Sequence, residues 1–348
     1  MQKTSQSKTN AGRFFEDYRI GDVIRHAVPR TVSGGERALY QALYPARHAL
    51  YSSDEFARSA GLPKSPLEDL AAFHIVFGKT VPDVSLNAVA NLGYAEGRWH
   101  LPVYEGDTLR SESEVIGLKQ NSNGKTGVVW VRTRGLNQRD EVVMDYVRWV
   151  MVRKGNVDAP APETVVPQLA EAIAPQDLAV PVGLDFTAYD FDLAGEPHRW
   201  GDYAVGEKID HVDGVTVEEA EHMLATRLWQ NTAKVHFDTT ARPDGTRLIY
   251  GGHVISMARA LSFNGLANAQ MIVGLNGGAH ANPCLSGTTI RAWSEVLDKA
   301  ETSAPGVGAI RLRLVATSGG APFALKGEDG KYLPEVLLDL DYWALMPM

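Results

Sequence analysis

Apolar and polar residues alternate along six stretches of the chain, which are rich in Val, Ile, Leu and aromatic residues. They are residues 108–118, 126–136 and 141–152, followed by 288–297, 309–317 and 335–345. A period of two with this composition predicts antiparallel strands that bury one face.

Helical spacing appears in two pairs of segments. Residues 34–44 and 217–228 are amphipathic, whereas 67–79 and 252–270 are longer and more apolar. In each half of the chain an amphipathic helix, a polar loop, an apolar helix and then strands follow one another. This order predicts the same supersecondary unit twice.

The two halves also share identical residues at a constant spacing. Asp17, Tyr18, Gly21, Ile24, His26, Thr31 and Glu36 match Asp202, Tyr203, Gly206, Ile209, His211, Thr216 and Glu221. A long helix followed by a bent antiparallel sheet is the layout of a hotdog fold. The repeat therefore predicts an α+β double hotdog, with one copy in 1–155, a proline-rich linker in 156–195 and a second copy in 196–348.

Composition excludes several kinds of partner. Of the 348 residues, 44% are hydrophobic and 22% charged, with a formal net charge of −8 and no lysine or arginine run, so we expect no nucleic acid partner. No apolar stretch has the length of a membrane span, and the first residues are polar, so we expect a cytoplasmic protein that binds no membrane. The single cysteine, Cys284, excludes an intrachain disulfide and a cysteine-cluster metal site.

The segment "QNTAKVHFD", residues 230–238, is the first candidate for chemistry. An imidazole exchanges protons near neutral pH, so His236 suits proton transfer; the alternative is a histidine that only holds a loop together. In the first copy Tyr51 takes the place of His236, Ala46 that of Asn231 and Ser53 that of Asp238. We therefore expect the first copy to be catalytically degenerate and the second to carry the active site.

Longer stretches resemble a known family. "AAFHIVFGKTVPDVSLNAVANLGYAEGRW", "EEAEHMLATRLWQNTAKVHFD" and "IYGGHVISMARALSFNGLANA" are similar to the mesaconyl-CoA hydratases, also called β-methylmalyl-CoA dehydratases, within the MaoC-like hydratases. The resemblance implies a hydro-lyase that reversibly adds water to mesaconyl-CoA to give β-methylmalyl-CoA. It implies an acyl-CoA substrate, a homodimer, and neither a cofactor nor a metal.

The wider MaoC-like pattern, D-x-N-P-x-H, assigns roles to particular positions. His236 occupies the histidine position and is the expected base, whereas Asn231 replaces the aspartate and is expected to orient water through its side-chain carbonyl. The alternative is that Asn231 only supports the loop, as asparagine often does in turns. Asp238 could fix the imidazole tautomer, supply a carboxylate base, or be solvated. Gly252, in "IYGGH" at the start of a helix, is the candidate backbone donor for the thioester oxyanion.

The implied substrate also carries a free carboxylate, which needs a cationic partner when it is buried. Arg47, His48 and Lys234 are candidates, and His253 could lie in the pocket or in the core. The candidate cations for the phosphates of CoA are Arg259, Arg291 and Lys79.

Three alternatives remain open at this point. The first is another hotdog acyl-CoA enzyme, either a thioesterase or a hydratase for a different branched enoyl-CoA, and the second is an acyl-CoA-binding protein without catalysis. Thirdly, Glu221 could supply a carboxylate, although a structural role is favoured because Glu36 occurs at the same place in the first copy. The glycine-rich stretch 274–283 predicts a turn between strands.

Overall fold

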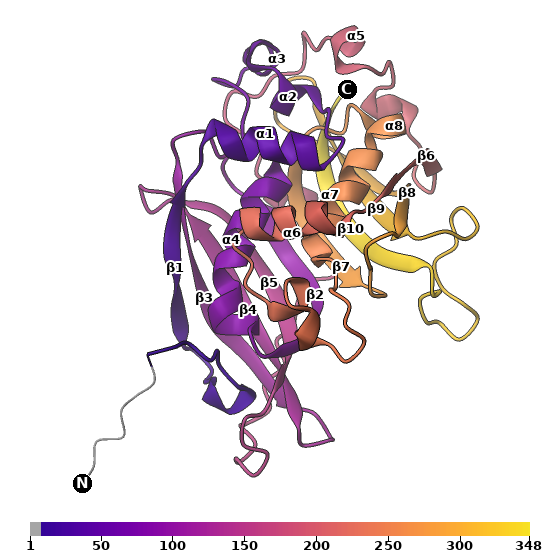
Figure 1. The fold of residues 1–348 in the computed structure, drawn as a ribbon. Coiled ribbons are helices and arrows are strands. Elements are labelled where there is room, and N and C mark those ends of the chain that lie inside the picture. The colour runs from indigo at the N-terminus through magenta and orange to yellow at the C-terminus, as the bar shows by residue number, and fades with distance from the viewer. Residues whose placement is uncertain (1–7) are drawn as a thin grey trace.

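One continuous antiparallel sheet dominates the computed structural model, which describes residues 8–348 (Figure 1). Within these residues the sheet has ten strands in the order β1-β3-β4-β5-β2-β7-β10-β9-β8-β6. The strands are β1 (Val23–Thr31), β2 (Ala88–Trp99), β3 (Thr108–Gln120), β4 (Thr126–Leu136), β5 (Val142–Arg153), β6 (Lys208–Thr216), β7 (Ile272–His280), β8 (Thr289–Glu301), β9 (Val307–Thr317) and β10 (Val336–Pro347).

The two halves of this sheet have the same strand order. Counted from its own first strand, each half runs first, third, fourth, fifth and second, and the two second strands, β2 and β7, pair at the centre with Tyr94 opposite Gly278. Equivalent histidines make equivalent contacts, since Nε2 of His26 lies 2.8 Å from Ser113 Oγ and Nε2 of His211 lies 2.8 Å from Ser294 Oγ. The predicted double hotdog fold is confirmed.

Two central helices lie against the sheet and meet each other (Figure 1). They are α4 (Asp69–Thr80) and α7 (Gly251–Leu261), joined where His74 Nε2 lies 2.7 Å from Ser256 Oγ. Every residue of α4 is buried, because the helix is packed on all sides and its sequence is apolar around its whole circumference. The helix predicted over 67–79 is confirmed.

The second apolar helix is shorter than the predicted range of 252–270. After α7 only α8 (Phe263–Leu266) follows, and within it Asn264 and Gly265 leave helical geometry, with Gly265 at φ 97°. A glycine adopts this left-handed conformation without steric cost, which ends the helix. The prediction of helix for residues 267–270 was therefore wrong.

The remaining helices are short. They are α1 (Gly34–Leu43), α2 (Ala49–Ser52), α3 (Asp54–Ser59), α5 (Phe191–Ala194), α6 (Glu219–Leu228), and the turns η1 (Phe15–Asp17), η2 (Val81–Ser85), η3 (Pro175–Asp177), η4 (Trp200–Asp202), η5 (Lys234–His236) and η6 (Thr239–Ala241). The predictions over 34–44 and 217–228 are confirmed by α1 and α6. Glu36 and Glu221 each accept a backbone N–H at the start of their helix, at 2.7 Å and 3.3 Å, which is a structural role.

All six predicted strands are present, in β3, β4, β5, β8, β9 and β10. The turn predicted over 274–283 was wrong, because residues 272–280 form β7 at the centre of the sheet. Glycine is useful there, since a Cβ on Gly278 would come within 3.0 Å of both Tyr94 and Leu340. Gly278 thus permits close packing across this strand.

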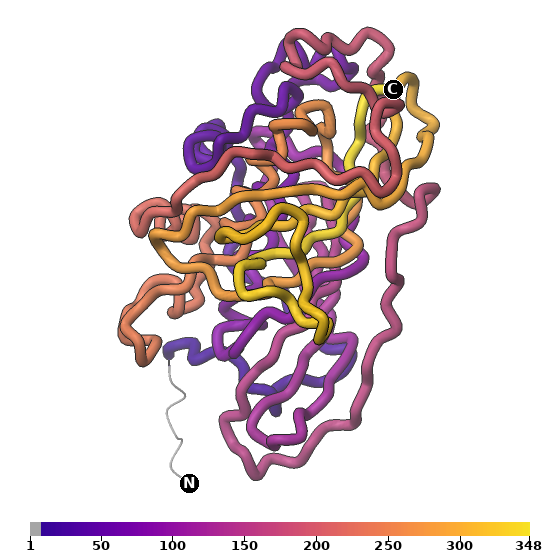
Figure 2. The backbone as a smooth tube through the Cα atoms, turned by 90° about the vertical axis from the view of Figure 1, so that its right-hand side faces the viewer, coloured from indigo at the N-terminus to yellow at the C-terminus, as the bar shows by residue number. Residues whose placement is uncertain are grey.

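The proline-rich segment between β5 and β6 runs along the outside of the molecule (Figure 2). It is anchored by an isolated bridge between Val165 and Leu118 and by Ile173, whose N–H donates to Asn276 Oδ1 at 2.8 Å. The boundaries 1–155, 156–195 and 196–348 stay predictions. No helix among residues 8–348 combines the length and the hydropathy needed to cross a membrane.

Candidate active site

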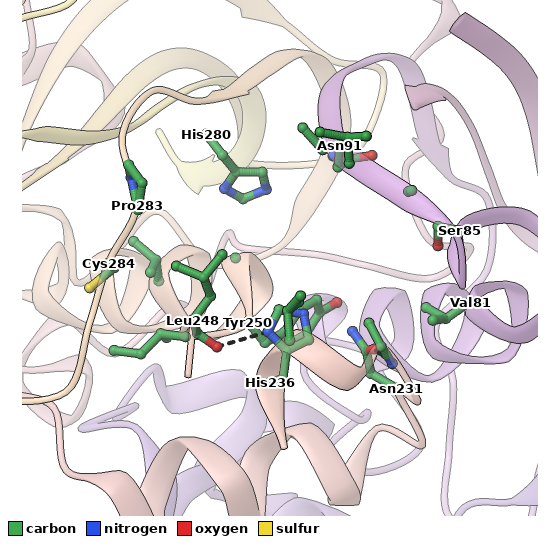
Figure 3. Close-up of a pocket in the computed structure, with 18 of the residues that line it drawn as sticks. Val81, Ser85, Asn91, Asn231, His236, Leu248, Tyr250, His280, Pro283 and Cys284 are labelled. Atoms are coloured by element: carbon green, nitrogen blue, oxygen red, sulfur yellow. Dashed lines mark hydrogen bonds between the residues drawn. The ribbon is translucent and has the colours of Figure 1, made fainter. Parts of the chain in front are cut away.

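A cavity of about 420 Å³ lies between the two halves of the chain (Figure 3). One wall comes from α7, β7 and the loop before α7, and the other from α4, η2, β2 and β5. Apolar side chains and glycine form most of the lining, whose polar members are Ser85, Asn91, Tyr94, Arg148, Asn231, His236, Arg242, Tyr250, His280, Asn282 and Cys284. Both copies of the repeat therefore shape one cavity.

His236 lines this cavity, and one hydrogen bond determines which of its ring nitrogens carries the proton. Its Nδ1 is 2.8 Å from the carbonyl oxygen of Leu248, and a carbonyl only accepts, so Nδ1 carries the proton and donates it (Figure 3). The Leu248 N–H in turn donates to Val235 O at 2.9 Å, which ties the two loop segments together. Nε2 of His236, which has no protein partner among the described residues, is left as a proton acceptor.

The surroundings of His236 keep the imidazole neutral. Burial lowers its pKa to about 4; the hydrogen bond to Leu248 acts in the opposite direction and the charge of His222 in the same one. The ring of Tyr250 meets the imidazole edge to face, with centroids 5.8 Å apart. A neutral, oriented imidazole at a cavity wall can act as a general base.

Asn231 lies beside His236 on the same wall and is 3% exposed (Figure 3). Its Oδ1 accepts the N–H of Ala233 at 3.0 Å, which leaves one lone pair of this oxygen for water, and Nδ2 has no protein partner within residues 8–348. The loop reaches this place because α4 has Gly78, where a Cβ would lie 1.8 Å from the Trp229 carbonyl oxygen. A glycine in the first copy thus positions the polar loop of the second.

The N-terminus of α7 faces the cavity through Gly251. Gly252, predicted to supply the oxyanion donor, is not among the lining residues; a Cβ there would meet Tyr250 at 2.5 Å and His74 at 2.6 Å. A Cβ on Gly251 would lie 2.4 Å from the His280 ring. The first N–H groups of a helix lack intrahelical acceptors and lie at the positive end of its dipole, so Gly251 is the better candidate by position.

His280 is a cavity residue that the sequence analysis did not identify. It ends β7 and faces the open space from the side opposite His236 (Figure 3), with Nε2 3.2 Å from the hydroxyl oxygen of Tyr94. Burial lowers its pKa to about 4, and the charge of His236 acts in the same direction. Because residues 274–283 were interpreted as a turn, their histidine was not connected with the site.

Asp238 and Lys234 lie close to His236 in the sequence but outside the cavity lining. The exposed Asp238 carboxylate accepts from the Thr240 N–H at 2.8 Å and from Thr240 Oγ1 at 2.6 Å, and it makes no hydrogen bond to His236. The imidazole tautomer is held by a backbone carbonyl instead. Lys234 is exposed on the outside of η5.

The other predicted substrate contacts also lie outside the cavity lining. The guanidinium of Arg47 lies 4.4 Å from the ring centroid of Phe263, and the buried His48 packs edge to face on the same ring. His253 is fully buried, with Nδ1 3.2 Å from the Tyr44 hydroxyl oxygen. His48 and His253 are thus packing residues in this structure, whereas Arg47 is exposed.

Arg148, on β5, is a cation of the cavity that the sequence analysis missed. Its side chain is fully buried, with the guanidinium 4.3 Å from the ring centroid of Phe77. Nη2 donates to Thr80 Oγ1 at 2.6 Å and to Ser85 Oγ at 3.4 Å. The signal was an arginine in the otherwise apolar strand "YVRWVMV".

The predicted cations for CoA phosphates are mostly inaccessible. Lys79 and Arg259 are buried and donate to backbone carbonyls, Lys79 to Val28 and Arg259 to Ala269 and Gln270. Arg291 is exposed but is not among the lining residues. The basic residue that does line the cavity near its polar loop is Arg242, paired with Asp244 at 2.6 Å.

The equivalent place in the first copy is filled by side chains. Tyr51, which takes the place of His236, donates a hydrogen bond to Asp69, and Asp69 begins α4 as Gly251 begins α7. Asp69 Oδ2 also accepts the N–H of Ile272 at 2.7 Å. Within residues 8–348, side chains thus fill this place in the first half, whereas the equivalent place beside His236 and Gly251 is open.

Among residues 8–348, no three His, Cys, Asp or Glu side chains come together in a group able to hold a metal ion. The lining includes two histidines and three asparagines but no carboxylate. Its chemistry is that of neutral imidazoles, amides, a helix N-terminus and one buried guanidinium.

Comparison with known proteins agrees with this architecture. The family model described as mesaconyl-CoA hydratase matches residues 3–320. A mesaconyl-CoA hydratase from Cereibacter sphaeroides is 78% identical over 98% of this chain and 99% of its own, and a β-methylmalyl-CoA dehydratase from Chloroflexus aurantiacus is 56% identical over 98% and 99%. The crystal structure of a MaoC domain protein dehydratase from C. aurantiacus superposes with a TM-score of 0.96, at 56% identity and 98% and 99% coverage.

The fold and the histidine-lined cavity define a MaoC-like double hotdog hydratase. Within that class, the chain belongs to the mesaconyl-CoA hydratase family. The resemblance expected from the sequence is confirmed.

Proposed function

We propose that this protein reversibly adds water to the double bond of mesaconyl-CoA, giving β-methylmalyl-CoA. One observation carries the proposal: His236 donates from Nδ1 to Leu248 and leaves Nε2 unpaired at a cavity that the N-terminus of α7 also faces. A base and an oxyanion donor at one cavity are what hydration of an enoyl thioester requires. The names of the relatives supply the substrate.

The proton moves through a single base. Nε2 of His236 takes a proton from water as the water oxygen bonds to the β-carbon, and the electrons of the double bond shift toward the thioester oxygen. The imidazolium then returns the proton to the α-carbon, so that one water is added and His236 is regenerated. Dehydration follows the same steps in reverse.

The developing enolate oxygen is stabilised at the start of α7. The backbone N–H of Gly251 lies at the positive end of the helix and has no intrahelical acceptor, and Gly252 N–H is the next donor along the chain. These dipoles are oriented before the reaction begins, so they stabilise charge without reorganising.

Asn231 holds the attacking water in this mechanism. Its Nδ2 hydrogens, which have no protein partner within residues 8–348, donate to the water oxygen, while Oδ1 accepts from Ala233. An amide cannot remove a proton, so His236 remains the base. Asp238, which is exposed and paired with Thr240, takes no part.

The reaction type is tested with purified protein and mesaconyl-CoA. We expect the absorbance of the enoyl thioester to fall without release of free thiol, equally before and after treatment with a chelator. Thiol release would indicate the alternative thioesterase, and binding with no change in either signal would indicate a non-catalytic acyl-CoA-binding protein. The homodimer and the cytoplasmic location stay predictions; sedimentation tests the first.

A further inference from the structure

Arg148 is a buried cation with unpaired hydrogen-bond donors. Arg148 is 0% exposed, and neither its Nε nor its Nη1 has a hydrogen-bond partner within residues 8–348. The contacts of Nη2, with Thr80 and Ser85, are to neutral hydroxyls, and the guanidinium forms no ion pair in the described part of the chain. A charge buried in this way is costly unless an anion compensates it.

The second half shows how the same arrangement looks when it is compensated. Arg148 lies over Phe77, the ninth residue of α4; the ninth residue of α7 is Arg259, which lies over Tyr342 at 6.0 Å. Tyr342 precedes a tryptophan in β10, as Arg148 does in β5. Each half therefore places one guanidinium over one aromatic ring between helix and strand, with the two residue types exchanged.

Arg259 has its electrostatic and hydrogen-bonding partners within the protein. Two buried carboxyl groups, Glu68 and Asp69, lie near enough for its charge to lower their pKa values, although burial raises both. Its own nitrogens donate to Ser262 Oγ and to the carbonyls of Ala269 and Gln270. This is the filled counterpart of the active site, where Asp69 stands in place of Gly251.

At the open cavity no such carboxylate exists, because none of the residues that line it is acidic. The anion for Arg148 must then come from outside the chain. In mesaconyl-CoA, one carboxylate is joined directly to the β-carbon that receives the hydroxyl group. A cation that holds this carboxylate also positions the β-carbon for the water activated by His236.

We propose that Arg148 binds the free carboxylate of a dicarboxylic acyl-CoA and so selects it over the corresponding monocarboxylic acyl-CoA. This inference rests on the proposed function for its substrate class. It replaces Arg47, His48 and Lys234, which lie outside the cavity lining.

Binding of unreactive saturated analogues separates this role from catalysis. Methylsuccinyl-CoA keeps the carboxylate, and 2-methylbutyryl-CoA has a methyl group in its place; both are titrated by calorimetry. The wild type is expected to prefer methylsuccinyl-CoA. In Arg148→Gln we expect affinity for methylsuccinyl-CoA to fall roughly 100-fold or more, with a change of about threefold or less for 2-methylbutyryl-CoA.

Two further variants keep the test decisive. Arg148→Lys retains the charge and is expected to keep part of the preference. Arg25→Gln removes an exposed arginine of β1 that lies outside the lining, and it is expected to change neither affinity. Circular dichroism and thermal melting check that each variant is folded. If Arg148→Gln unfolds, Arg148→Lys still tests the proposal, because a retained preference for methylsuccinyl-CoA over 2-methylbutyryl-CoA shows that a positive charge at this position binds the carboxylate.

Three results would overturn the proposal: equal losses for both analogues, no loss for methylsuccinyl-CoA, or a wild type without preference. Because the analogues do not react, a wild type that binds methylsuccinyl-CoA through Arg148 but fails to hydrate mesaconyl-CoA would refute the proposed function alone.

Discussion

The hydroxyl of Tyr51 donates a hydrogen bond to the carboxylate of Asp69, and this pair occupies the place where the other half has His236 and Gly251. Both side chains are buried, and Glu68 lies beside them. Duplication of the fold thus provided two equivalent places, of which one was filled and the other kept open. The open one takes a wall from each half.

The base is tested by comparing two variants that are close in sequence. His236→Ala removes the unpaired Nε2 at the cavity, and we expect kcat to fall by roughly 10²–10⁴-fold, the usual contribution of a general acid–base group. Asp238→Asn changes only an exposed carboxylate bonded to Thr240, and we expect kcat to stay within about twofold. Steady-state rates with mesaconyl-CoA decide the order; an equal loss in both variants would make a carboxylate the base.

Asn231→Asp rebuilds the aspartate of the wider MaoC-like pattern. A carboxylate can still accept the N–H of Ala233, but it loses the Nδ2 donors and adds a negative charge near the substrate carboxylate. We therefore expect a modest loss in kcat and a higher KM. A variant that is faster than the wild type would refute the role of Asn231 in holding water.

The pH profile follows from the lowered pKa of His236, at about 4, for which burial is the main cause. Above that pH Nε2 is free to accept a proton, and protonation removes the base only as the pH falls through about 4. The acid limb of kcat/KM is thus expected near pH 4, well below the ordinary histidine value of about 6.5. A limb near 6.5 on folded enzyme would mean that the imidazole is solvated.

Gly251→Ala tests the close approach at the start of α7. A Cβ there would lie 2.4 Å from the His280 ring, so either the helix start or the imidazole must shift. We expect a loss of at least tenfold in kcat, because donors act only when they are aligned with the oxyanion. The double variant Gly251→Ala/His280→Ala restores the space, and a double-mutant cycle in kcat should show strong coupling. Additive losses in kcat would show that the effect of Gly251→Ala does not arise from its contact with His280.

The buried Glu68, beside Tyr51 and Asp69 in the first half, predicts that the free energy of unfolding depends on pH. Burial raises the pKa of Glu68 to about 8, above its ordinary value of 4.5, so the folded state holds a proton that the unfolded chain releases. The stability that this proton contributes is complete below about pH 4.5 and is lost as the pH rises toward 8.

Glu68→Gln removes the titrating proton, so its melting temperature should rise relative to the wild type as the pH increases from 5 to 8. Glu55→Gln, at an exposed position, is the control and should follow the wild type. A constant difference between Glu68→Gln and the wild type across this range would show that Glu68 is ionised in the folded protein.

The sequence alone determined the fold and its duplication. Period-two alternation identified six strands, and identical spacing of residues such as His26 and His211 revealed the repeat, because both signals lie in local order along the chain. His236 was also predicted as the base in this way, since its neighbours form a recognisable run and the first copy has Tyr51 there. Strand β7 was mistaken for a turn, because the packing of Tyr94 and Leu340 that accounts for Gly278 is not visible in the local sequence.

Which cations and donors reach the cavity was decided only by the tertiary structure. Lys234 is close to His236 in sequence and Arg47 lies near Tyr51, the counterpart of His236 in the first copy, yet both are outside the lining, whereas Arg148 enters it from a strand of the first half. His280 reaches the cavity from the central strand β7. Gly251, the first residue of α7, lines the cavity, whereas the predicted Gly252, one residue further along the helix, does not. A charged side chain is assigned by what it is buried against, and that depends on how helix and sheet from two distant halves of the chain pack together.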